Sequence, residues 1–305
     1  MSAANRRQII DESITQLKEF AHDDAYKQYR YAIVENILFL EAAKHIGTYI
    51  RWLLTRLKHI QRDDIIELTD LPVPLWDKEM HTYLMALQRN THIGLGLPLV
   101  ERVISLIEKK QGTSVILDIG AGGMELDKQI CTKLLGKKHL YPVILVGIDA
   151  SETVRKLANT TMQSVQDVTV HSFERFTKYD LDTIKKDAQG IHVVICGNNI
   201  FRLAEEFPKG EIDIIYHSLF KHHISDQKHS QLDTLFRECA NTVLEYDGYR
   251  FVPSLIPQSV TGWKYPILLS DAVFSWVRYK DKRTLESAPG LTKFYKSTGH
   301  YLREF

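Results

Sequence analysis

The chain has 305 residues, more than one compact core usually holds, which indicates one large domain plus an accessory region. Hydrophobic residues make up 44% and charged residues 25%, the balance of a globular protein rather than of a disordered tail. The formal net charge of +1 excludes an overall basic field of the kind nucleic-acid-binding proteins carry, but it does not exclude a local basic face.

Three features of the sequence indicate the cellular compartment in which the protein works. Cys131, Cys196 and Cys239 are too far apart in the sequence to form a metal-ligand motif or a disulfide framework, which favours a reducing cytoplasm. The start of the chain runs into charged residues and does not resemble a secretory signal. No apolar run approaches the ~20 residues of a membrane helix. We therefore expect a soluble, cytoplasmic protein with no membrane partner.

The N-terminal region, residues 1–75, is predicted to be helical. It contains no proline before Pro72 and a single glycine, Gly47, and its apolar residues recur at helical spacing up to about residue 65. Two interpretations stay open: a lid or recognition domain over an active site, or a packing extension through whose helices the chain forms a homodimer. Pro72 and Pro74 end this region.

Residues 76–305 show a different pattern. Helices are predicted at 78–88 and 97–110, with a glycine-punctuated turn at 90–96 between them. From Ser114 onward, short β-branched runs of the type buried on both faces of a parallel sheet alternate with helical patterns. The runs are 115–117, 143–146, 191–195, 212–216 and 249–252, and the helices are 124–135, 152–162 and 231–244. This alternation predicts a doubly wound, mainly parallel α/β sheet.

A glycine-rich turn follows the first of these strands. Asp118-Ile119-Gly120-Ala121-Gly122-Gly123 leads directly into the helix that begins near Met124. Glycines allow positive φ and close approach of a ligand to the backbone. No Gly-Lys-Ser/Thr follows, so this is not a phosphate loop of the Walker type, and Glu125 stands where a dinucleotide fingerprint has its third glycine. The turn therefore favours a nucleoside ligand.

The second strand ends in Asp149, 31 residues after Asp118. An acidic side chain at this point can accept hydrogen bonds from both ribose hydroxyls of a nucleoside. The alternative is a tight strand–helix turn followed by an incidental surface aspartate.

At these residues the chain resembles class I S-adenosylmethionine-dependent methyltransferases. Leu117–Gly123 is similar to their first motif, and Val146–Ser151 to their second. Residues 195–199 and 213–223 are similar to the ends of the third and fourth strands. A bacterial small-molecule subgroup has a Ser-x-x-x-His-His stretch like the one that starts at Ser218, and a lead-in like Leu87–Asn90.

The resemblance implies S-adenosyl-L-methionine as cofactor. Gly120, Ala121 and Gly122 would pass under its amino acid part, Asp149 would hold the ribose, and Asn198 would meet the adenine. The matching motifs also place Asp118, Ala150, Asn199 and His217 at the cofactor site. The sequence departs from the family at Met124, where a third glycine is usual, at Asn198, where aspartate is commoner, and in a helical insertion near 178–189. Alternatively, residues 168–171 form the third strand, with Phe173 and Glu174 near the adenine.

His222 and His223 follow the fourth predicted strand and are the candidate catalytic residues. A histidine at this rim could take a proton from a hydroxyl or amine acceptor, or it could cap the next helix or contact the substrate passively. No metal is predicted, since adjacent histidines chelate poorly. Ser225 or Asp226 would cap the following helix. The residues from about 253 to 305, rich in aromatic side chains, would shape the acceptor side, and 293–295 with 301–303 would form a closing hairpin.

The sequence thus predicts an enzyme that methylates oxygen or nitrogen of a small-molecule acceptor. One alternative is an RNA methyltransferase that uses the helical N-terminal region to grip RNA, which the low net charge disfavours. Another is a catalytically silent, methyltransferase-like scaffold, consistent with the departures at Met124 and Asn198.

Overall fold

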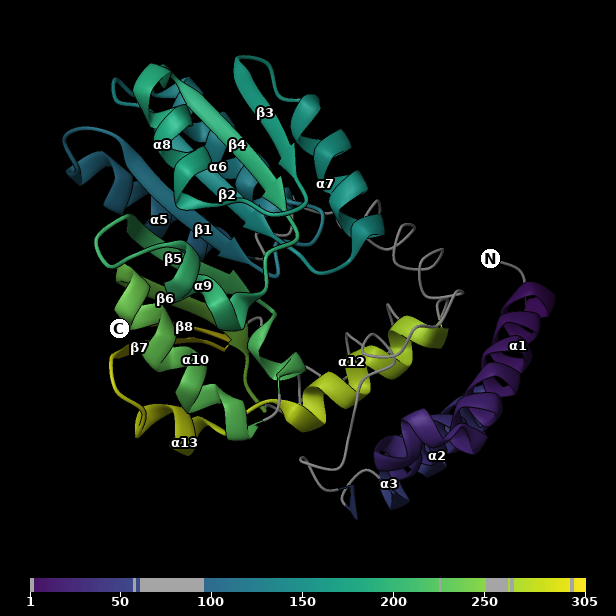
Figure 1. The fold of residues 1–305 in the computed structure, drawn as a ribbon. Coiled ribbons are helices and arrows are strands. Elements are labelled where there is room, and N and C mark those ends of the chain that lie inside the picture. The colour runs from purple at the N-terminus through teal and green to yellow at the C-terminus, as the bar shows by residue number, and fades with distance from the viewer. Residues whose placement is uncertain are drawn as a thin grey trace. The chain divides into compact units, whose positions relative to one another are not determined.

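The computed structural model describes residues 3–56, 59–60, 96–224, 226–250, 263, 266–296 and 299–305. It contains an eight-stranded sheet in the order β3-β4-β2-β1-β5-β6-β8-β7 (Figure 1). The strands from β3 to β6 pair in parallel, and β7 and β8 form an antiparallel hairpin. The strands are β1 (Ser114–Ile119), β2 (Val143–Ile148), β3 (Val168–Phe173), β4 (Ile191–Cys196), β5 (Ile212–Ser218), β6 (Ala240–Gly248), β7 (Leu291–Tyr295) and β8 (His300–Glu304).

Helices cover both faces of this sheet. One face packs on α5 (Leu97–Lys109), α6 (Glu125–Gly136) and α7 (Glu152–Gln163), and the other on α8 (Lys178–Asp187), α9 (Leu203–Glu206) and α10 (Asp226–Cys239). Within β1, Ile116 points to the first group of helices, whereas Val115 and Leu117 point to the second. Because both faces are covered, the strands are apolar at successive positions. The predicted doubly wound, mainly parallel α/β sheet is confirmed, as are the N-terminal helices.

The chain divides into two compact units. One contains the sheet, and the other is helical. The helical unit contains the described residues of 1–86, 248–286 and 297–299. Its elements are α1 (Ala3–His22), η1 (Asp24–Tyr29), α2 (Arg30–Ala43), α3 (Ile46–Thr55), α12 (Pro266–Arg278) and α13 (Lys282–Glu286). Phe39 of α2 lies at its centre, with ring centroids 5.0 Å from Trp52 and 5.5 Å from Phe274. The helix α12 therefore completes a core that the N-terminal helices begin.

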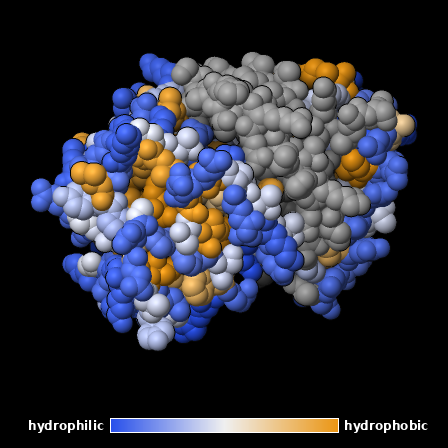
Figure 2. Space-filling view, turned by 90° about the horizontal axis from the view of Figure 1, so that it is seen from above, coloured by the Kyte–Doolittle hydropathy of each residue, from blue (hydrophilic) through white to orange (hydrophobic). Residues whose placement is uncertain are grey.

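The surface of the described residues is of mixed polarity. Figure 2 shows hydrophilic residues over most of the visible described surface, with hydrophobic residues gathered in patches between them. Among the described helices, none combines the length and the hydrophobicity that crossing a bilayer requires. The cysteines Cys131, Cys196 and Cys239 are buried free thiols.

The helix predicted at 231–244 is α10, but it ends at Cys239, and residues 240–244 belong to β6 (Ala240–Gly248). Of the strand predicted at 249–252, Tyr249 makes only an isolated bridge with Lys280, and residues 251–252 lie outside the described residues. In β6 the side chains alternate between the two faces of the sheet, so Leu244 and Tyr246 face one core and Glu245 and Asp247 the other side. The strand-like alternation of apolar residues in β6 directly follows the helical pattern of α10, and the two patterns overlap in the sequence.

Several predictions lie outside the described residues. These are the prolines at 72 and 74, the helix at 78–88, most of the turn at 90–96, the lead-in at 87–90, the cap at Ser225 and the aromatic and proline residues at 253–257 and 265. The division into domains at 75 stays a prediction. The closing hairpin is present as β7 and β8, and the helical insertion near 178–189 is α8.

Candidate functional site

The candidate site lies at the carboxyl ends of the parallel strands. The chain builds one side of the sheet from β1 through β2, β3 and β4, and then crosses over to place β5 on the other side of β1. Ligands of open α/β sheets bind at such a switch point, outside the carboxyl ends of the strands. The predicted site residues lie at the carboxyl ends of β1, β2, β4 and β5 or directly after them, so the topology brings them to one edge of the sheet.

The glycine turn is held against the end of β2. The backbone N–H groups of Gly120 and Ala121 donate to the carbonyl of Ile148 at 2.9 and 3.1 Å. Gly120 and Gly122 have φ of 69° and 54°, which only glycine adopts without strain. A Cβ on Gly120 would lie 2.4 Å from the Phe220 ring, whereas no atom of the described residues lies within 4 Å of a Cβ placed on Gly122. One glycine thus allows close packing, and the other borders space that no described side chain fills.

Met124 occupies the position where the resemblance expects a third glycine. Its φ of 58° and ψ of 35° are left-handed, so the backbone keeps the conformation that glycine would take. Its side chain is fully buried beneath the turn, where the Cε atom lies 2.7 Å from a Cβ built on Gly147 of β2. The methionine side chain therefore points into the core beneath the turn.

Asp149 reaches from the end of β2 to the glycine turn. Its Oδ1 accepts from the N–H of Ser151 at 2.9 Å, and its Oδ2 from the N–H of Gly122 at 3.1 Å. Burial raises the pKa of this carboxyl, while these two bonds, Arg155 and His223 act in the opposite direction. Each carboxylate oxygen can accept two hydrogen bonds, so two acceptor positions remain after the backbone bonds are made. The carboxylate is oriented before a ligand arrives.

Arg155 of α7 forms hydrogen bonds and an ion pair with the segments that surround Asp149. Its guanidinium donates to the carbonyls of Asp149 and Ala150, both at 2.9 Å, and pairs with the carboxylate of Glu174 at 3.3 Å. Gly197 packs so closely that a Cβ there would lie 2.9 Å from the guanidinium. This arginine was not predicted, because an arginine in the first turn of a helix gives no sign in the sequence of which loops it contacts.

Asn198, predicted to meet an adenine, has an internal role in the structure. It is buried, its Oδ1 accepts from the N–H of Phe176 at 2.8 Å, and its Nδ2 donates to the carbonyl of Phe176 and to the carboxylate of Glu206. Both amide N–H groups are therefore used to fix the loop after β3. Asn199 is exposed and caps the next turn by accepting from the N–H of Phe201. A role of either side chain toward a base stays a prediction.

The alternative third strand also exists: it is β3, at the edge of the sheet beside β4. Phe173 packs on Phe176 with ring centroids 5.2 Å apart, and the Glu174 side chain is largely exposed. Both alternatives are thus strands of one sheet, and Ile148 of β2 is in register with Cys196 of β4, two residues before Asn198.

His217 is a fully buried histidine at the end of β5. Its neighbours in register are Ile119 of β1 and Glu245 of β6. Its ring lies against Phe220 and Phe236, and among the described residues neither ring nitrogen has a hydrogen-bond partner. Burial lowers its pKa from 6.5 to about 4, so the ring is neutral near pH 7.

His222 and His223 lie in η7 (Lys221–His223), directly after β5. The Nδ1 atom of His222 is 2.8 and 3.1 Å from the two carboxylate oxygens of Asp247, at the end of β6. The two histidine rings contact each other with centroids 4.2 Å apart, and His223 acts electrostatically on Asp149. The histidines and the Asp149 carboxylate therefore belong to one region, and Asp247 orients the ring of His222.

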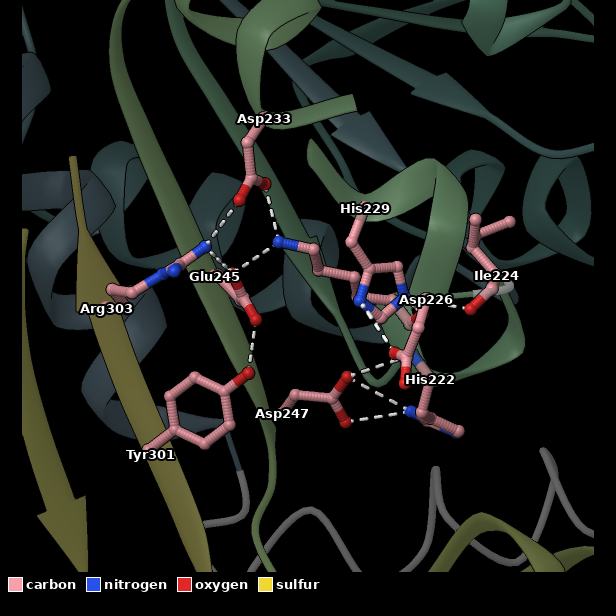
Figure 3. A network of polar contacts seen from close by, with 10 residues as sticks. His222, Ile224, Asp226, His229, Asp233, Glu245, Asp247, Tyr301 and Arg303 are labelled. Atoms are coloured by element: carbon pink, nitrogen blue, oxygen red, sulfur yellow. Dashed lines mark hydrogen bonds and ion pairs between the residues drawn. The ribbon is translucent and has the colours of Figure 1, made fainter. Parts of the chain in front are cut away.

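A buried charge network anchors this histidine turn (Figure 3). The ammonium of Lys221 lies 2.5 Å from Asp233 of α10 and 3.2 Å from Glu245, and Arg303 of β8 contacts the same two acids at 3.1 and 2.5 Å. Tyr301 donates to the second oxygen of Glu245. Burial alone would raise the pKa of Glu245, but the two cations lower it by more, and it stays ionised.

Glu245 and Asp247 were not predicted as part of the site, because the start of β6 follows a helical pattern in the sequence. The sequence does contain a signal for this strand: acids alternate with apolar residues from Leu244 to Asp247, as in a strand with one charged face. Within the described part of the chain, no three histidine, cysteine, aspartate or glutamate side chains are grouped so as to hold a metal ion.

Comparison with known proteins finds no matching family model and no matching curated protein. Solved structures match at low similarity. The plantazolicin methyltransferase BpumL in complex with SAH has a TM-score of 0.41 and 14% identity over 69% of this chain and 70% of that one. The magnesium protoporphyrin IX methyltransferase of Synechocystis PCC 6803, with bound SAH, has a TM-score of 0.41 and 11% identity over 89% and 97%. The YcgJ protein of Bacillus subtilis has a TM-score of 0.37 and 17% identity over 64% and 65%. At this level of similarity, function has to be inferred from the side chains of this chain.

Proposed function

We propose that this chain is an S-adenosylmethionine-dependent methyltransferase that acts on oxygen or nitrogen of a small-molecule acceptor. The observation that carries the proposal is the Asp149 carboxylate, fixed by backbone N–H groups of Gly122 and Ser151 and left with two acceptor positions at the switch point of the sheet. That arrangement suits the vicinal hydroxyls of a ribose.

The glycine turn fits the rest of such a ligand. Gly122 borders space that no described atom fills, so a ligand can approach the backbone there. Met124 does not obstruct this side, because its side chain is buried against Gly147. We infer that Gly120, Ala121 and Gly122 lie along the amino acid part of the cofactor, with Asp118 behind them, and that Ala150, Asn198, Asn199 and His217 complete the site.

The protein's own part in catalysis is alignment and proton removal. When bound, S-adenosylmethionine supplies a methyl group that is already activated on a sulfonium, so positioning contributes much of the rate. An acceptor that enters with its proton needs a base, and we assign this role to the histidine pair. Asp247 at 2.8 Å holds Nδ1 of His222, as the carboxylate of a catalytic dyad holds its histidine. His223, next to it and near Asp149, is the second candidate.

The first experiment is a calorimetric titration with S-adenosylmethionine. Asp149→Asn should weaken binding by roughly 10- to 100-fold, because hydrogen bonds to a charged acceptor contribute about 1.5–3 kcal/mol. Glu174→Gln is the matched control, since it removes an exposed carboxylate at the end of β3, and it should change the affinity less than about twofold. A large loss with Glu174→Gln instead would place the adenine at β3.

The same titration separates an enzyme from a silent scaffold. The scaffold alternative is supported by Asn198, because both of its amide N–H groups donate to groups of the protein and are not available to a cofactor. A wild-type chain that binds no cofactor at millimolar concentration would support the scaffold and refute the methyltransferase. Binding without methyl transfer to any hydroxyl or amine acceptor would refute methylation of oxygen or nitrogen and leave only the cofactor site.

A homodimer through the N-terminal helices is part of the same proposal. Apolar side chains stand exposed at helical spacing on α2 and α3, namely Tyr31, Val34 and Leu38, and Ile46, Ile50 and Leu54. A monomer in size-exclusion chromatography at micromolar concentration, unchanged by Ile50→Lys, would rule this interface out.

A further inference from the structure

Two buried acids face each other directly behind the glycine turn. Asp118 is the last but one residue of β1, and Asp127 lies in the first turn of α6, with exposed fractions of 3% and 0%. Tyr216 of β5 is the register partner of Asp118, and its hydroxyl donates to Oδ1 of Asp127. The three side chains therefore converge from three elements on the α6 side of the sheet.

The two carboxyl groups lie close enough to act on each other as a hydrogen-bonding pair, in a direction that raises the pKa of Asp118 and lowers that of Asp127. Such a pair needs a proton, because ionised carboxylates can only accept. Among the described residues, no N–H or hydroxyl group donates to Oδ1 of Asp118 or to Oδ2 of Asp127. Asp127 receives the Tyr216 hydroxyl and lies at the positive end of α6, both of which favour its ionised form. The proton therefore belongs on Asp118, which donates it to Asp127.

Among the described residues, no cation acts on this pair. The other titratable groups that act on it are Glu125, Asp149, Cys131 and Tyr216, and none of these is a cation. Burial raises the pKa of both carboxyls, that of Asp127 to about 6, so one negative charge remains near pH 7. A buried charge with no cation to neutralise it is costly, and the glycine turn beside it borders space that no described atom fills.

We propose that Asp118 and Asp127 share one proton and present a single buried negative charge to the glycine turn, and that this charge makes the site prefer the cationic methyl donor to its uncharged product. The inference rests on the proposed function. The donor carries an ammonium, a sulfonium and a carboxylate and has a net charge of +1. The product has lost the sulfonium charge and has a net charge of zero. A site that binds the more positive ligand more tightly exchanges product for donor without any movement of the chain.

A series of asparagine substitutions tests both the shared proton and its effect. The measured quantity is the ratio of the dissociation constants for S-adenosylhomocysteine and S-adenosylmethionine, by calorimetry at pH 7. Asp118→Asn and Asp127→Asn should each leave the ratio within about twofold, because a carboxamide N–H replaces the shared proton and one carboxylate remains. The double variant has no charge, and its ratio should fall by about tenfold, within the usual range of coupling between sites.

Each other pattern contradicts the inference. A ratio unchanged in the double variant means that the pair is electrically silent, and a large fall in either single variant means that both acids are ionised. Glu125→Gln is the matched control for a general field effect: it removes a less buried charge from the same helix end, and a tenfold fall there would also overturn the assignment to the pair. If the double variant does not fold, Asp118→Asn combined with Asp127→Leu removes the same charge. A wild-type chain that binds neither ligand refutes the proposed function instead.

Discussion

Met124 offers the sharpest test of how the glycine turn is built. Its backbone is left-handed, with φ of 58°, at the residue that precedes α6, and its side chain is fully buried against Gly147. A left-handed conformation costs a residue with a Cβ about 1–2 kcal/mol. Truncating a buried methionine to alanine costs about 2–5 kcal/mol.

Two substitutions separate these contributions. Met124→Ala loses the packing and keeps the backbone strain, so it should destabilise the protein by about 2–5 kcal/mol. Met124→Gly loses slightly more packing but has no strain at this φ. We therefore expect the glycine variant to be about 1 kcal/mol more stable than the alanine variant. In an ordinary helix the order is reversed, since glycine is about 1 kcal/mol worse than alanine.

Urea unfolding followed by circular dichroism measures the difference. Alanine and glycine at Thr132, an exposed position inside α6, provide the control pair, and there alanine should be the more stable by about 1 kcal/mol. If glycine at position 124 is less stable than alanine by as much as at position 132, the left-handed backbone does not control this site, and the account of the turn is wrong.

Three further predictions concern buried groups. Gly147→Ala places a Cβ 2.7 Å from Cε of Met124 and should cost about 1–3 kcal/mol in urea unfolding, whereas combining it with Met124→Ala should recover part of that cost; a purely additive pair would refute the contact. Lys221→Met leaves buried acids short of one cation and should cost about 3–5 kcal/mol, against less than about 1 kcal/mol for Lys156→Met at an exposed pair. His217, with its pKa lowered to about 4 by burial, stays neutral in the folded chain while the unfolded chain takes up a proton below 6.5. Stability should therefore fall as the pH drops from 6.5 to about 4, by about 3 kcal/mol relative to His217→Leu, and parallel pH profiles would contradict this.

The sequence predicted the half of the sheet whose strand ends form the candidate site. Four buried strands, β1, β2, β4 and β5, are continuous apolar runs, and such runs do not depend on distant residues for their interpretation. The glycine turn and Asp149 were found because their spacing is local. The structure joins them by one hydrogen bond, from Gly122 to the carboxylate.

What the sequence could not predict depends on contacts between distant segments. Asp247 became a partner of His222 only when β6 was placed beside β5. Asn198 was expected to face a base, but its amide is used by Phe176 and Glu206, which only the loop after β3 brings near. Side chains of one type can serve a ligand or the protein itself, and the choice is made by neighbours that are far away in the chain.

The position of β4 in the sheet has a consequence for folding order. β2 and β3 follow each other in the chain, yet β4, which comes later, lies between them. A nascent chain that has just completed β3 therefore has no place for it on β2 if the native register is to form. We expect β3 to join last in this half of the sheet, and its backbone amides to exchange with deuterated water sooner than those of β1 and β2.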